Sequence, residues 1–455
     1  MADLPPAGTL PAGTPGAPAR PTGWRRVLPL VLLIGLIAGC TVWILFRLGS
    51  DLGPVAFAVG LAAALIPVPL LVLTFLWLDR YEPEPVVYLL LCFGWGAAVA
   101  TTVASQVNTW SADLFDRVGL PDALVAVLVA PVIEETMKAG FPLLLLWRRR
   151  REISGITDGI VYCGLSATGF AMVENILYLG GYGWNAGDKY GPASAANMVI
   201  IVFIGRILFS AFAHPLFTSM TGIGLGTAAR SADRRVRWLA PLAGLIVAMM
   251  LHGSWNLMAV LSSSAGQPLI QLYGYFAVMV PIFLAMIGFA IWLRSREGRL
   301  TERTLPVYVR AGWLSPPEVA ALATLGRRYS ARRWARRVAG DAGSKAMRDY
   351  QYAATRLALL RDGVERGLDR TPAEVAQTAA DERRLLDTIA LCRNVFTGRD
   401  PQAPAAVWDG ARYHVTFPDG QRRPLDPPPE PVVPIPVLLA PPPGLYPPPG
   451  FRGYR

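Results

Sequence analysis

Seven ionisable side chains lie deep inside apolar segments of this chain, and their types are those that acid–base and metal chemistry use. A charge at the centre of a bilayer costs roughly 3 kcal/mol on insertion scales, so such groups are rarely kept without a use. The apolar segments on either side carry no such group, which indicates one internal polar site. The seven are Glu134, Glu135, Lys138, Glu174, Arg206, His214 and His252.

Two of these side chains, Glu134 and Glu135, are adjacent in sequence, and Lys138 follows one helical turn later. On a helix Lys138 neighbours both carboxylates. It can hold one of them ionised while the other stays free to exchange a proton, which is what general acid–base catalysis needs. The alternative is a buried ion pair that only fixes helix packing.

The two histidines occupy neighbouring apolar segments. His214 precedes Pro215, which we expect to kink its helix. His252 lies one turn before Asn256, and both could bind a substrate carbonyl oxygen or the oxyanion formed on it. Glu174 has no cation in its own segment, so we expect it to pair with Arg206.

A glutamate and two histidines can activate water in two ways. They can hold zinc with an open coordination position, for which the candidate ligands are Glu174, His214 and His252. Alternatively, a glutamate takes the proton directly while the histidines polarise the carbonyl. The H-E-x-x-H spacing of metal ligands on one helix is absent, and residue types do not choose between the two.

The elements that position these groups are long apolar runs in a chain of 455 residues that is 53% hydrophobic and 16% charged. This pattern predicts an all-α polytopic membrane protein. The sixth run is longer than one crossing needs, so we expect it to be tilted, kinked or partly outside the membrane. The eight predicted spans are about 27–46, 54–78, 86–107, 122–147, 155–180, 196–229, 236–262 and 271–293.

Arginines mark one set of connecting loops and predict the orientation. Positive residues stay on the cytoplasmic side, so both termini should be cytoplasmic in a multi-pass protein of the plasma membrane. The net charge of +11 then reflects this asymmetry and a basic tail, and it indicates an anionic inner leaflet rather than nucleic acid. The arginine-rich connections include Arg25 and Arg26, Arg80, Arg148 to Arg151, Arg230 to Arg237, and Arg294 to Arg299.

The rest of the chain divides into four parts around a membrane domain at 24–300. We expect a disordered tail at 1–23, a cytoplasmic helical region at 301–400, a β-hairpin at 401–424 and a proline-rich disordered tail at 425–455. The helices expected in this region run at about 316–338, 342–367 and 372–396, and capping boxes begin the first and the third. The first is strongly basic, which fits either the anionic inner membrane surface or a solvated face.

Five motifs in the order found here resemble the PrsW family of intramembrane proteases, within the wider clan of CAAX-processing enzymes. The resemblance covers about 78–260 and implies hydrolysis of a peptide bond in a membrane-anchored protein, such as an anti-sigma factor. The motifs are Asp79-Arg80-Tyr81-Glu82-Pro83-Glu84-Pro85, Glu134-Glu135-x-x-Lys138, Phe170-x-x-x-Glu174-Asn175, His214, and His252-x-x-Trp255-Asn256.

The resemblance implies roles for particular residues. Glu134 or Glu135 would be the water-activating base, His214 and His252 would polarise the carbonyl or bind metal, and Asn256 would assist at the oxyanion. Glu174 would be a supporting residue or ligand, and the cofactor stays open, with zinc as the candidate. The supporting residues are Lys138, Phe170, Asn175, Arg206 and Trp255.

Two other functions are compatible with the sequence. A proton-coupled transporter or channel could relay protons along glutamate and histidine side chains, although no inverted repeat is visible in the sequence. A non-catalytic membrane scaffold would instead recruit partners through its proline-rich end.

Overall fold

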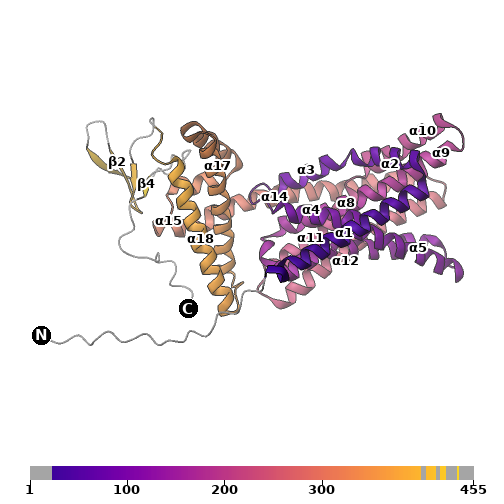
Figure 1. The fold of residues 1–455 in the computed structure, drawn as a ribbon, viewed down its shortest axis with the longest axis horizontal. Coiled ribbons are helices and arrows are strands. Elements are labelled where there is room, and N and C mark those ends of the chain that lie inside the picture. Colours follow the sequence, from indigo (N-terminus) through magenta and orange to yellow (C-terminus); the bar gives the residue numbers. More distant parts are fainter. Residues whose placement is uncertain (1–22, 401–405, 417–420, 427–437, 440–455) are drawn as a thin grey trace.

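The computed structural model describes residues 23–400, 406–416, 421–426 and 438–439. Figure 1 shows a long bundle of helices, with a smaller helical domain and a small sheet at one end. The expected disordered tails at 1–23 and 425–455 lie largely outside the described residues. The fold confirms the prediction of an all-α polytopic membrane protein.

Seven helices of the bundle are long and apolar enough to cross a membrane. Several are continuous through short π-helical turns, labelled η. Their parts are α1 (Gly23–Leu52), α2 (Pro54–Leu65) with α3 (Val68–Leu78), α4 (Val86–Gly94) with η1 (Trp95–Ala100) and α5 (Thr101–Arg117), α8 (Ile156–Leu177) with η4 (Tyr178–Asn185) and α9 (Ala186–Asp188), α10 (Pro192–Phe203) with η5 (Ile204–Phe209) and α11 (Ala213–Ala229), α12 (Arg234–Ser264), and α13 (Leu269–Gly274) with η6 (Tyr275–Met279), α14 (Val280–Thr304) and α15 (Pro306–Arg310).

The remaining expected span, the fourth along the chain, is α6 (Asp122–Leu124), η2 (Val125–Val129) and α7 (Ala130–Arg149), followed by the short helix η3 (Arg150–Glu152). This segment is not one of the seven apolar helices, because the charged residues Glu134, Glu135 and Lys138 lie in its middle. All three are buried inside the bundle, so the rest of the protein shields them from lipid.

The long sixth segment is interrupted, although not where Pro215 predicted. The chain leaves helical geometry at 210–212, between η5 and α11. Pro215 then lies in the first turn of α11, where its missing N–H would have had no helical partner. The break therefore places His214 at the start of a new helix, inside the bundle.

Helix α8 is the centre of the bundle and is buried along most of its length. Glycines allow α11 to lie directly against it. A Cβ on Gly159 of α8 would stand 2.0 Å from the carbonyl oxygen of Gly222 in α11, which no side chain tolerates. A second close approach joins α11 to α12 at Gly224 and Gly244. These contacts fix the helices that carry Glu174, His214 and His252.

The domain beyond the bundle contains α16 (Pro316–Leu322), α17 (Leu325–Glu365) and α18 (Pro372–Phe396). Both capping boxes form, at Ser315 and at Thr371. The helix expected at 316–338 is divided at 323–324, and α17 continues through non-helical dihedral angles at Ala339 and Gly340.

A small sheet follows the helices, in the strand order β3-β2-β1-β4. Strands β1 (Ala406–Trp408) and β2 (Tyr413–Thr416) pair antiparallel, as in the expected hairpin. Strand β3 (Arg422–Leu425) pairs with β2, and β4 (Leu438–Leu439) is parallel to β1.

The helical domain is joined to one end of the bundle by charged side chains. Arg328 of the basic helix is buried and donates to the carbonyl oxygen of Tyr81 at 3.2 Å. Arg356 lies 3.4 Å from Glu82, and Arg230 pairs with Asp362. Arg328 thus serves the junction between domains, which neither interpretation of the basic helix had predicted.

Candidate active site

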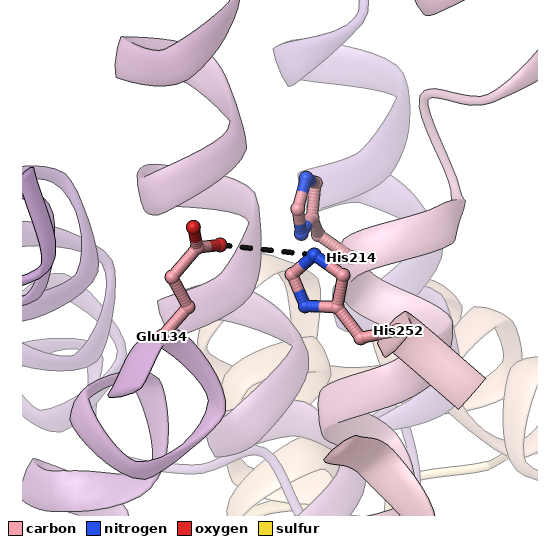
Figure 2. Close-up of side chains that lie close together, drawn as sticks. All are labelled: Glu134, His214 and His252. Atoms are coloured by element: carbon pink, nitrogen blue, oxygen red, sulfur yellow. Dashed lines mark ion pairs between the residues drawn. The ribbon is translucent and has the colours of Figure 1, made fainter. Parts of the chain in front are cut away.

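The buried polar residues of four helices meet in the bundle. Figure 2 shows Glu134 of α7 pointing toward His214 of α11 and His252 of α12. One ligand atom of each lies within 4.8 Å of the others. Glu134, His214 and His252 also line a cavity of about 640 Å³, whose wall continues along α5, α8 and η4. Three groups predicted from the sequence therefore share one chamber.

Glu135 is completely buried, and both of its oxygens are occupied. Its Oε1 lies 2.9 Å from Lys138 Nζ and 2.9 Å from His252 Nδ1. Its Oε2 accepts a hydrogen bond of 2.6 Å from the hydroxyl of Thr218. A carboxylate with three such donors has no room for water, so Glu135 orients its neighbours.

Glu134 is 7% exposed and lines the cavity. Asn108 of α5 donates to its Oε1 at 3.2 Å. Its Oε2 is 3.4 Å from Lys138 Nζ and 3.8 Å from His252 Nε2. These longer contacts leave Oε2 free to exchange a proton with a molecule in the cavity. The adjacent glutamates therefore occupy different environments.

Lys138 connects the cluster. Its fully buried ammonium contacts both glutamates and lies 2.9 Å from His214 Nδ1. It also stands 4.1 Å from the centre of the Phe170 ring, whose π face attracts a cation. Since an ammonium has three donors, Glu134, Glu135 and His214 account for all of them.

The other nitrogen of His214 faces Glu174, with 2.7 Å between Nε2 and Oε2. Arg206 Nη2 contacts the same oxygen at 2.7 Å, so the expected pair of Arg206 and Glu174 is present. Arg206 also donates to Asn175 and lies 3.6 Å above the ring of Tyr178. Glu174 therefore supports His214 at the ring nitrogen that does not face Lys138.

Each histidine thus has a carboxylate on one ring nitrogen, and the other nitrogen faces the cluster. Glu135 holds Nδ1 of His252, and Glu174 holds Nε2 of His214. Carboxylates of this kind commonly orient histidine ligands of metals. Glu134 and the two histidines also match a zinc donor set in type and spacing. The residues therefore fit a metal, with Lys138 as a competing cation beside it.

Asn256 and Trp255 line the cavity, but the amide of Asn256 already donates to the carbonyl oxygen of Ala126 at 2.8 Å. This bond attaches α12 to the π-helical turn before α7. The sequence analysis missed Asn108 and Thr218. Thr218 had a signal, because it lies one turn after His214, whereas Asn108 is one of several polar residues in its segment.

A second acidic cluster lies at the end of the bundle that meets the helical domain. Asp79, Glu84 and Asp158 are buried together, and Tyr162 donates to Glu84 at 2.5 Å. Burial raises the pKa of Asp79 to about 9. Burial, and after it the charge of Asp158, raises the pKa of nearby Glu82 to about 7. Protons held by Asp79 and Glu82 therefore neutralise part of the negative charge of this acidic cluster.

The membrane region of the chain is similar to known proteins. The model of the PrsW family intramembrane metalloproteases matches residues 84–310. Protease PrsW of Bacillus subtilis is 31% identical over 179 residues, which is 39% of this chain and 72% of the relative. Proteins of the same name from Geobacillus kaustophilus and Clostridioides difficile are 29% and 24% identical, over 40% and 39% of this chain and 72% and 69% of their own lengths.

No solved structure is significantly similar to the chain. The matched region contains the six helical segments from α4 to α14, among them those that carry Glu134, Glu174, His214 and His252, and it ends before α16. The helical domain and the sheet lie outside it. The chain is therefore a multi-pass membrane peptidase and belongs to the PrsW family of intramembrane proteases.

Proposed function

We propose that this protein cleaves a membrane-anchored protein with water activated by Glu134. The observation that carries the proposal is the difference between the two adjacent glutamates. Glu135 has both oxygens filled by donors, whereas Glu134 lines the cavity and keeps an oxygen with only long contacts. A general base must reach the water that it deprotonates, and Glu134 meets that condition.

The reaction then follows from the side chains around the cavity. Glu134 takes a proton from water, and the oxygen of that water adds to the carbonyl carbon of the scissile bond. His252, whose ring Glu135 holds at Nδ1, turns Nε2 toward Glu134 and stabilises the oxyanion. Glu134 returns its proton to the leaving amine nitrogen as the C–N bond breaks. Glu135, Glu174 and Thr218 position the histidines.

We propose Glu134, His214 and His252 as the residues that would hold a zinc ion in a metal-dependent form of the enzyme, in which Glu134 would be a ligand rather than the base. When bound, such an ion supplies Lewis acidity to the carbonyl and to water. We further propose that the helical domain is cytoplasmic, because the arginine-rich loops and this domain lie at the same end of the bundle. A membrane-anchored regulatory protein, such as an anti-sigma factor, is the proposed substrate class.

The test compares membrane proteomes of cells with wild-type protein and with Glu134→Gln. We expect Glu134→Gln to remove cleavage products while the purified variant unfolds at the wild-type temperature. Asp113→Asn, on an exposed part of α5, is the matched control and should cleave normally. If Glu134→Gln cleaves the same proteins as the wild type, Glu134 is not the base. If cells with the wild type and cells that lack the protein give identical membrane proteomes, the protease proposal itself fails.

A further inference from the structure

Asn108 of α5 faces the cavity beside Glu134 with one half of its amide unused. Its Nδ2 donates to Glu134 Oε1 at 3.2 Å. Its Oδ1 is buried and accepts no hydrogen bond. Among the described residues that line the cavity, it is the one buried side-chain polar atom without a partner. The neighbouring Thr101, by contrast, bonds to the carbonyl oxygen of Gly96.

An acceptor left unpartnered in the interior costs about 1 to 3 kcal/mol, so its presence in a functional cavity indicates a ligand that supplies a donor. The substrate of an intramembrane protease supplies such donors. Its peptide bond becomes accessible only where the segment leaves helical geometry, and this frees backbone N–H groups in surroundings that offer them no water. An N–H beside the scissile bond then needs an acceptor within reach of Glu134.

The amide dipole of Asn108 is oriented for both tasks. An ionised Glu134 accepts hydrogen bonds and cannot donate them, so it fixes Nδ2 toward itself and Oδ1 away from itself. Backbone N–H groups are the donors that every substrate sequence carries. Recognition through Oδ1 therefore selects an unwound segment rather than a particular side chain.

We propose that Asn108 is a substrate-binding residue that accepts a backbone N–H next to the scissile bond and positions Glu134 through its other end. The inference rests on the proposed protease function. It assigns to α5, which carries none of the motifs found in the sequence, one wall of the substrate site. The ligand is an extended peptide segment of a membrane protein.

The test uses a synthetic membrane-spanning peptide that contains a cleavage site mapped in the proteomic comparison. In a series of peptides, an ester replaces one amide at each position flanking the scissile bond, which removes a single N–H. With the wild type, we expect one of these esters to lower kcat/KM by about 3- to 10-fold, the worth of one hydrogen bond. Asn108→Leu should cleave the all-amide peptide at least about 10-fold more slowly and should show no loss at that ester.

Asn108→Asp separates the two ends of the side chain. It keeps an acceptor and loses the donor to Glu134, so we expect a lower kcat with the ester effect retained. Asp113→Asn should behave as the wild type with both peptides. If Asn108→Leu does not fold, Asn108→Ala replaces it in the same comparison.

The proposal is overturned if the sensitive ester costs Asn108→Leu as much as it costs the wild type. It is also overturned if no ester position affects the wild type. A wild-type enzyme that cleaves no membrane peptide would instead remove the protease function and this role together, whereas normal cleavage with an unchanged ester profile removes this role alone.

Discussion

Replacing Lys138 with methionine tests whether the cluster is held by charge. Lys138 is fully buried, and its ammonium contacts Glu134, Glu135 and His214. Removing one partner of a buried ion pair costs about 3 to 5 kcal/mol, because the other charge stays buried without compensation. Glu135 keeps hydrogen bonds from Thr218 and His252, so we expect a loss near the lower end, about 3 kcal/mol.

The assay is reversible unfolding of the purified protein in detergent, with Lys138→Met, Glu135→Gln and the double variant measured together. The double variant removes the charges of Lys138 and Glu135 together, so its free energy of unfolding should be about 2 kcal/mol higher than that of Lys138→Met. Neither Lys138→Met nor the double variant should cleave a substrate. Arg148→Met is the control, because it removes a positive charge from an exposed residue at the end of α7, and it should unfold as the wild type. Equal stability of Lys138→Met and the wild type would refute the idea that two ionised glutamates surround this lysine.

Three further predictions concern the neighbours of the cluster and the packing that holds it. Thr218→Val removes the donor to Glu135 Oε2 and should slow cleavage by about 10-fold or more, whereas Thr218→Ser should restore it. Burial raises the pKa of Glu82 to about 7, so the folded state binds a proton at Glu82 more tightly than the unfolded state does. The melting temperature should therefore fall as the pH rises from 5 to 7. A fall of the same size in Glu82→Gln would contradict the assignment to Glu82. Gly159→Ala places a methyl group against α11 and should lower stability by at least about 1 to 3 kcal/mol, with Gly35→Ala, in open space on α1, as the control.

The location of the site could be predicted from the sequence because charge is costly in apolar segments. Glu134, Lys138, Glu174 and the two histidines stood out for that reason, and helices with few alternative arrangements had to bring them together. The division of roles between Glu134 and Glu135 could not be predicted. Adjacent residues on a helix point about 100° apart, and the rotation of α7 against α11 and α12 decides which one faces the cavity.

Neutral polar residues carried much less information. A threonine or an asparagine costs little in an apolar segment, so Asn108 did not stand out from others such as Ser105, and Thr218 was marked only by its place one turn after His214. The break at 210–212 was also hidden, because it contains no proline or glycine, while Pro215 fits the first turn of α11. Arg328 looked like its exposed neighbours, and only the packing of α17 against the bundle shows that it is buried.

The charges of the cluster make one more prediction, about zinc. Glu134, Glu135 and Glu174 carry three negative charges when ionised, and Lys138 and Arg206 supply two positive ones, so one negative charge remains for a proton or a cation. Two unit charges at 4 Å interact by about 4 kcal/mol in protein surroundings, so the ammonium of Lys138 strongly opposes a divalent ion at Glu134, His214 and His252. Lys138→Met should therefore bind zinc more than about tenfold more tightly than the wild type in a competition titration with a chromophoric chelator. Adding Glu134→Gln should reverse this gain in zinc affinity, because it replaces a charged metal ligand with a neutral one. An affinity that Lys138→Met leaves unchanged would mean that zinc, if it binds, lies away from this cluster.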